Sequence, residues 1–161
     1  MLNLKIEDCL KIIFIISFIS LISAYFIEYI LGHQPCNLCL IERIPYGLSI
    51  ILIFISFIFK QDQKFFLLLL ILVFVFSFLI SMYHFGIEQN FFQESSICGL
   101  ENSGELISKE ELLKQLSKKT ISCRDVTFKI FGLSLTSINV IVSLIITFFL
   151  IKMYKAYEKN K

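Results

Sequence analysis

The residues best suited to chemistry are the cysteines, of which the 161-residue chain has five. Cys36 and Cys39 form a Cys-x-x-Cys motif. A disulfide at this spacing closes a tight ring and constrains little chain, which is typical of a dithiol that cycles between its reduced and oxidised states. Local spacing therefore favours pairing these two, which leaves Cys98 to pair with Cys123. That second disulfide would close a long loop and stabilise the fold by about 3–4 kcal/mol by restricting the unfolded chain.

Two other interpretations of these cysteines stay open. Both pairs could be structural crosslinks, which fits Cys98–Cys123 as well as a redox role does but fits the tight Cys36–Cys39 ring less well. The four cysteines could instead bind zinc, but such sites are built from two closely spaced pairs, and Cys98 and Cys123 are far apart in the sequence. We therefore predict redox-active cysteines and no metal site.

Two polar residues could assist chemistry at the first pair. Arg43 follows Cys39 by four positions, so on a helix the two side chains share a face, and the guanidinium could stabilise a thiolate or a polar oxygen of a ligand. The alternative is that Arg43 only reaches the membrane interface, with Glu42 as its partner. His84 ends a later apolar segment at the same expected depth, where a histidine can equally be a polar anchor. We predict Arg43 and His84 as polar residues of a site beside the first cysteine pair.

The elements that position these residues are hydrophobic segments. Of all residues 57% are hydrophobic and 17% charged, against roughly 45–50% and about 25% in soluble domains. Asp, Glu, Lys and Arg are absent from four stretches: residues 12–27, 44–59, 65–87 and 130–151. A soluble helix needs a polar face, and about 20 apolar residues span a bilayer. The composition therefore excludes soluble, disordered and fibrous proteins.

We predict an all-α membrane protein with a four-transmembrane-helix bundle in one integral-membrane domain, residues 1–161. The spans are expected at about 12–31, 41–59, 65–84 and 130–151, with outer loops at about 32–40 and 85–129. The first segment resembles a signal peptide in its charges, but Ile22 fits the cleavage site poorly. We therefore expect it to remain as a span.

The distribution of lysines predicts the orientation of the bundle. Lysines are dense in the N-terminal segment, the second connector and the C-terminal tail: Lys5, Lys11, Lys60, Lys64, Lys152, Lys155, Lys159 and Lys161. Such segments face the cytoplasm. Both termini are therefore expected inside, with Cys9 as a free thiol there and the other four cysteines on the oxidising outer side. The net charge of +2 requires no nucleic-acid partner.

The long outer segment contains one further recognisable pattern. Ser108 and Glu111 fit a capping box, and Leu112, Leu113 and Leu116 follow it. This predicts a short amphipathic helix that lies either on the membrane surface or on the rest of the loop. Small and polar residues around Cys98 predict a mobile tether that carries this cysteine.

Several of these segments together resemble one protein family. The first-loop signature of the DsbB family of inner-membrane disulfide-generating enzymes is similar to Pro35-Cys36-Asn37-Leu38-Cys39-Leu40-Ile41-Glu42-Arg43. Further matches are Tyr83-His84-Phe85-Gly86-Ile87-Glu88, the Cys98…Cys123 pair, and Phe131-Gly132-Leu133-Ser134-Leu135 with Asn139. The resemblance covers nearly the whole chain in order.

The resemblance implies an electron relay in the bacterial inner membrane, with a periplasmic loop between helices 3 and 4. A DsbA-like periplasmic thioredoxin-fold dithiol oxidase would attack the Cys98–Cys123 disulfide, with Cys98 in the mixed disulfide. Cys123 would then exchange with Cys36–Cys39. Cys39, beside Arg43, would pass two electrons to a membrane quinone, either ubiquinone or menaquinone. By its matching position, His84 would line the quinone pocket.

Two alternatives to this function stay open. One is a non-catalytic membrane scaffold whose outer loops are held by two inert disulfides. The other is a member of the same family that serves one dedicated partner. The partners expected from the leading interpretation are the thioredoxin-fold protein, membrane lipid and quinone, and no nucleic acid.

Overall fold

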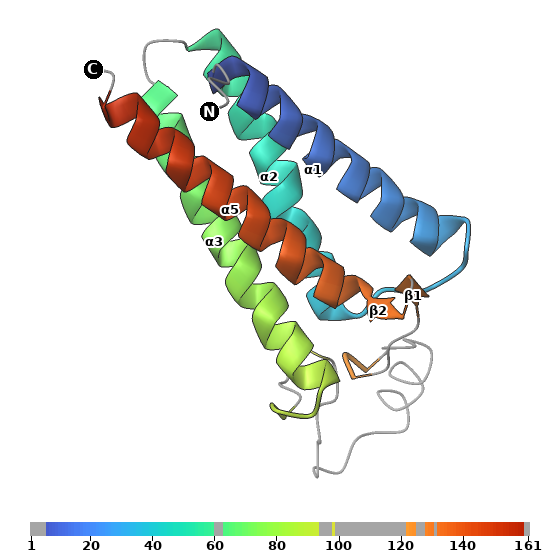
Figure 1. The fold of residues 1–161 in the computed structure, drawn as a ribbon. Helices are drawn as coiled ribbons and strands as arrows, with labels where there is room; N and C mark the ends of the chain where they lie inside the picture. The colour runs from blue at the N-terminus through green and yellow to red at the C-terminus, as the bar shows by residue number, and fades with distance from the viewer. Residues whose placement is uncertain are drawn as a thin grey trace, which may run out of the picture.

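Four long helices form a bundle in the computed structural model, which describes residues 6–59, 63–93, 98, 122–124, 128–130 and 132–159. In chain order the helices are α1 (Ile6–Tyr29), α2 (Asn37–Ile58), α3 (Gln63–Glu88) and α5 (Leu135–Lys159) (Figure 1). All four are long and apolar enough to cross a membrane. The predicted class, an all-α membrane protein with a four-helix bundle, is therefore confirmed.

The order of packing places α2 and α3 at the centre of the contacts. Helix α3 packs against both α2 and α5, and α1 packs against α2. The first turn of α1 and the last turn of α5 lie at the same end of the bundle (Figure 1). The α1–α2 connection and the start of α5 lie together at the other end, which is the end that holds the cysteine pairs.

Small polar side chains fill the helix interfaces. Ser49 of α2 donates a hydrogen bond to Ser17 of α1 over 2.9 Å, and the hydroxyls of Ser77 in α3 and Ser143 in α5 are 3.0 Å apart. All four serines are completely buried. Large apolar side chains such as Phe76 point outward instead. This arrangement suits lipid, where small residues let helices approach closely and apolar surface needs no burial.

Helix α2 begins earlier than the span expected at residue 41. Cys36 is its N-cap, because its side chain accepts a hydrogen bond from the backbone N–H of Cys39. Helix α3 likewise extends to Glu88, beyond the expected end at residue 84. The expected spans follow the stretches without charged residues. A helix can continue past such a stretch until its terminal backbone groups find hydrogen-bond partners. Residues 37–40 and 85–88 are therefore helical rather than loop.

The last helix begins later than the span expected from residue 130. A two-stranded antiparallel hairpin precedes it, in which β1 (Lys129–Ile130) pairs with β2 (Leu133–Ser134). Gly132 in its turn has φ of +84°, a conformation that suits glycine and interrupts a helix. The hairpin was not predicted, because the sequence through this turn stays apolar. The amphipathic helix expected around residues 108–119 and the tether flanking Cys98 lie outside the described residues.

Replacing Ser77 by leucine should destabilise the bundle by about 1–3 kcal/mol, because the larger side chain would overpack the α3–α5 interface. The neighbouring Phe76→Leu variant is the matched control, since its side chain is 55% exposed. We expect that variant to unfold within about 0.5 kcal/mol of the wild type. Detergent-induced unfolding in micelles measures both, and equal stability of the two variants would contradict the assigned interface.

Candidate functional site

A cavity of about 330 Å³ opens between the helices at the end of the bundle where α2 begins. Its apolar wall comes from α1 and α5, including Ala24, Ile27, Ile138 and Val142. Its polar wall comes mainly from α2 and α3, and includes Cys36, Cys39, Glu42, Arg43 and His84. A cavity of this size, mostly apolar with a few convergent polar groups, is typical of a small-molecule site.

The Cys-x-x-Cys motif occupies the first turn of α2. The two Sγ atoms are 2.8 Å apart, and both cysteines are free thiols. Cys36 is buried, and its sulfur also accepts the backbone N–H of Cys39 over 3.3 Å. Cys39 is only half-buried and lines the cavity. Both cysteines therefore line the cavity, and Cys39 is the more exposed of the two.

These contacts make Cys36 strongly acidic in the reduced pair. The hydrogen bond from the Cys39 thiol, helped by His84 and by the backbone N–H of Cys39, lowers the pKa of Cys36 from 9.0 to about 4, although burial opposes the shift. A thiol at the N-terminus of a helix is also stabilised as a thiolate by the helix dipole. Cys36 is therefore the thiolate of the pair at neutral pH.

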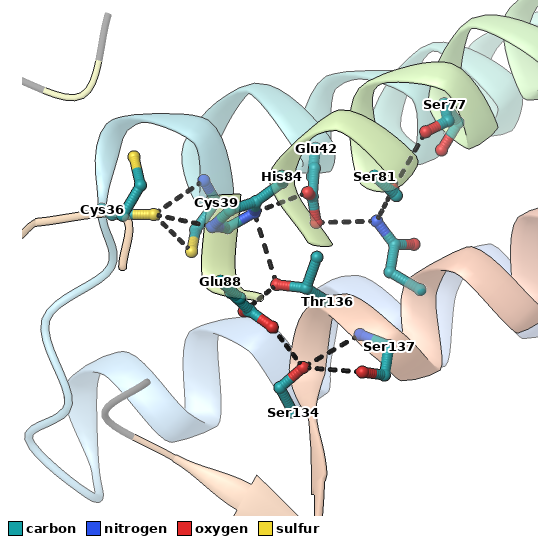
Figure 2. Close-up of polar contacts among 12 residues, drawn as sticks. Cys36, Cys39, Glu42, Ser77, Ser81, His84, Glu88, Ser134, Thr136 and Ser137 are labelled. Atoms are coloured by element: carbon teal, nitrogen blue, oxygen red, sulfur yellow. Dashed lines mark hydrogen bonds and ion pairs between the residues drawn. The ribbon is translucent and has the colours of Figure 1, made fainter. Parts of the chain in front are cut away.

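His84 lies between Cys36 and Glu42 and contacts both. The Nε2 atom of His84 is 3.6 Å from Cys36 Sγ, and its Nδ1 atom is 2.8 Å from a carboxylate oxygen of Glu42 (Figure 2). The other carboxylate oxygen of Glu42 accepts a hydrogen bond from Asn139 of α5 over 2.8 Å. Sequence reasoning had considered Glu42 only as a partner for Arg43. The signal it missed was a carboxylate inside an otherwise apolar helix, which needs a partner within the bundle.

Arg43 faces a different helix from Glu42. Its guanidinium forms an ion pair with Glu28 of α1 and lies 5.1 Å from the centroid of the Tyr25 ring. The charge therefore remains partly buried at the wall of the cavity, where Cys39 also lies. The alternative pairing of Arg43 with Glu42 is not the one that the structure contains.

The second cysteine pair lies in the same buried cluster as Cys36. Cys98 and Cys123 form a disulfide with a Cα–Cα distance of 5.6 Å. Both are buried in the same cluster as Cys36, together with Leu38 and Ile87. Cys123 also lines the cavity. All four cysteines predicted as site residues are therefore gathered at one end of the bundle.

A third carboxylate secures the start of α5. Glu88, at the end of α3, accepts hydrogen bonds from Ser134 and Thr136, each over 2.6 Å (Figure 2). Thr136 Oγ1 also lies 3.3 Å from Nδ1 of His84. These contacts hold the start of α5 against the end of α3, beside His84. Sequence reasoning did not identify Glu88 or Thr136 as part of the site.

The geometry fits a dithiol better than a metal site. Cys36, Cys39 and His84 place three donor atoms within 4.8 Å of one another. Two thiolates on one zinc ion would be about 3.8 Å apart, given a Zn–S bond of about 2.3 Å and tetrahedral angles. The observed 2.8 Å between the sulfurs suits a pair that forms and breaks a disulfide.

Comparison with known proteins gives two matches. A family model described as disulfide bond formation protein DsbB matches residues 7–153. A curated protein of Rickettsia prowazekii (strain Madrid E), whose name is "Uncharacterized protein RP370", is 33% identical over 137 residues. The match covers 84% of this chain and 80% of that protein. No solved structure matches the chain.

In the reduced protein, the alkylation rate of Cys36 should be nearly constant from pH 6 to 8. The rate should fall only as the pH drops through about 4, because protonation then removes the thiolate. Mass spectrometry after treatment with a small alkylating reagent follows each cysteine separately. A rate that rises about tenfold per pH unit between pH 6 and 8, as for an unperturbed thiol, would contradict this assignment.

Proposed function

Since the chain belongs to the DsbB family, a family of disulfide bond formation proteins, we propose that it reoxidises a periplasmic DsbA-like dithiol oxidase and transfers the electrons to a membrane quinone. The observation that carries this proposal is the packing of both cysteine pairs into one buried cluster beside a cavity. Family membership supports a membrane disulfide oxidoreductase. The partner, the quinone, the inner membrane and the periplasmic position of the four cysteines are parts of the proposal.

The proposed relay begins at the second pair. A thiolate of the partner attacks Cys98, so that a mixed disulfide forms and Cys123 leaves as a thiolate. Cys123 then attacks Cys36, which forms a Cys36–Cys123 bond and releases Cys39. The membership of Cys36, Cys98 and Cys123 in one buried cluster supports this order. Exchange between the pairs would then need only local movement of side chains.

The resulting intermediate is resolved within the same cluster. The partner's second cysteine displaces Cys98 and leaves as an oxidised protein. Cys98 then attacks Cys123, which reforms their disulfide and leaves two electrons on Cys36 and Cys39. The structure has this arrangement of bonds, with Cys98–Cys123 closed and the first pair as thiols.

The residues around the cavity fit a lipid-soluble quinone, either ubiquinone or menaquinone. Such a group accepts two electrons and two protons when it is bound. The apolar wall from α1 and α5 suits a ring and the start of an isoprenoid tail. Cys39 lines the cavity and can deliver electrons there, while Arg43 places a positive charge on the same wall. Ion pairing with Glu28 holds that charge in place.

A structural crosslink remains the second candidate role for one pair. Cys98 and Cys123 are only 1% and 2% exposed, as is usual for an inert disulfide. The non-catalytic scaffold requires both pairs to resist mild reductant, whereas the relay requires both to open. Thiol titration at increasing reductant therefore separates the two functions.

Cys39→Ser should abolish quinone reduction by a reduced thioredoxin-fold partner, because the cysteine that faces the cavity is lost. Cys9→Ser is the matched control, since Cys9 lies near the start of α1 and the cavity lies near the end of that helix. This variant should retain wild-type turnover. The change in quinone absorbance with a short-chain quinone measures both rates. Undiminished reduction in Cys39→Ser would refute the relay.

Glu28→Gln should raise the KM for the short-chain quinone about tenfold, a loss of about 1.4 kcal/mol, and leave kcat close to wild type. The reason is that Arg43 would lose the carboxylate that fixes its guanidinium at the cavity wall. Arg43→Gln should show a larger rise in KM. Steady-state kinetics at saturating partner measures both constants, and an unchanged KM in Arg43→Gln would remove this residue from the quinone site.

A further inference from the structure

A line of polar contacts leads from Cys36 into the interior of the bundle. It runs from Cys36 Sγ to His84 Nε2 at 3.6 Å, and from His84 Nδ1 to Glu42 at 2.8 Å (Figure 2). Asn139 donates from α5 to the other oxygen of Glu42 over 2.8 Å and to Ser81 over 2.7 Å. Three helices therefore contribute to the line, and its outer end is a reacting sulfur.

The burial of this line determines its charge. His84 is 1% and Glu42 is 8% exposed. A carboxylate at such a position costs several kcal/mol unless a positive group compensates it. The ionisable group that contacts Glu42 is His84, because Arg43 is turned toward Glu28 on α1. An imidazolium on His84 satisfies the carboxylate and leaves its Nε2–H directed at Cys36.

We propose that His84 and Glu42 set the reduction potential of the Cys36–Cys39 pair. In this arrangement His84 is the catalytic residue that donates a charged hydrogen bond to the sulfur of Cys36. Glu42 is a positioning residue, since it holds the imidazole in the required orientation and keeps it protonated. Stabilising the reduced form of a disulfide makes the pair a stronger oxidant. The first pair would thereby draw electrons from Cys98–Cys123.

The step in which the charge appears can be written with its electrons and protons. When Cys98 attacks Cys123, the Cys98–Cys123 bond forms and the Cys36–Cys123 bond breaks. The electron pair of the broken bond leaves on Cys36, where the Nε2–H of His84 meets it. Of the two thiol protons that the partner gives up, one ends on Cys39 and one is released to solvent. Reduction of the first pair therefore takes up two electrons and one proton.

Other ionisable groups near Cys36 and His84 are few within the described residues. Helix α2 contributes Cys39 beside Glu42, and Tyr46, whose hydroxyl donates a hydrogen bond to Asn139. His33, which precedes α2, lines the same cavity. Helix α3 contributes Glu88, which is bound by Ser134 and Thr136. Helix α5 places the uncharged Thr136 and Asn139 against His84 and Glu42. Helix α1 contributes Glu28, which Arg43 neutralises. Cys123 is in a disulfide and Arg124 is exposed.

Titration of the full-length protein against glutathione, in detergent without quinone or partner, tests the proposal. Mass spectrometry of alkylated peptides reports the Cys36–Cys39 pair separately from the other cysteines. His84→Gln keeps a side chain that can donate a hydrogen bond but cannot carry positive charge. We expect it to shift the equilibrium constant of the pair toward the disulfide at least tenfold, which is about 30 mV. Glu42→Gln should shift it at least threefold in the same direction.

The pH dependence of the equilibrium constant of the Cys36–Cys39 pair separates this role from a structural one, because a purely structural role of His84 would leave it unchanged. In the wild type, one proton should accompany the two electrons from pH 6 to 8, and two protons only at lower pH. The pH at which the number of protons changes from one to two is the breakpoint. His84→Gln should move it upward by at least one pH unit, since Cys36 would then be protonated more readily. A breakpoint and an equilibrium constant that match the wild type would overturn the proposal.

Glu158→Gln is the control, because it removes a carboxylate of α5 that pairs with Lys64 and does not line the cavity. It should change the equilibrium constant less than twofold. A Glu42→Gln shift no larger than that of Glu158→Gln would overturn the role of Glu42. If His84→Gln fails to fold, as judged by thermal unfolding and the state of Cys98–Cys123, His84→Asn takes its place.

The inference rests on the proposed function only in treating Cys36–Cys39 as redox-active, and the two can fail separately. An unchanged potential in His84→Gln together with normal turnover would overturn the inference alone. The expected shift in His84→Gln, found while the wild-type protein fails to reduce quinone, would overturn the quinone step alone.

Discussion

The contact between Glu42 and His84 is the constraint on which the rest of the site depends. A carboxylate inside an apolar bundle must have its charge and both oxygens satisfied, because lipid offers no water to do so. Glu42 meets this need with His84 from α3 and Asn139 from α5. The same contacts therefore fix the spacing of three helices and place an imidazole beside Cys36. Stability and redox chemistry share these atoms.

Two adjacent residues of α2 divide the site between them. Consecutive positions on a helix are about 100° apart, so Glu42 and Arg43 reach different neighbours. Glu42 turns to α3 and supports Cys36, while Arg43 turns to Glu28 of α1 and the cavity. Both cysteines of the motif line the cavity, and Cys36 is the more buried of the two.

Much of this arrangement could be predicted from the sequence, because lipid imposes simple rules. Uncharged stretches revealed the four helices, and the Cys-x-x-Cys spacing with Arg43 indicated redox chemistry. The partners of Glu42 and Arg43 could not be predicted, since they depend on which helix lies on each side of α2. The hairpin before α5 was missed for a different reason. It depends on the backbone of Gly132 rather than on any change in hydropathy.

The length of α1 has a consequence for the thiol chemistry of the whole chain. Cys9 lies near one end of this helix, and Cys36 follows shortly after the other end. The twenty steps from position 9 to position 29 rise about 30 Å at about 1.5 Å each, which is the thickness of a hydrocarbon core. Small soluble thiols that equilibrate with Cys9 would thus be insulated from the other four sulfurs by the lipid itself. One polypeptide could hold two thiol populations at different redox poise without any exchange between them.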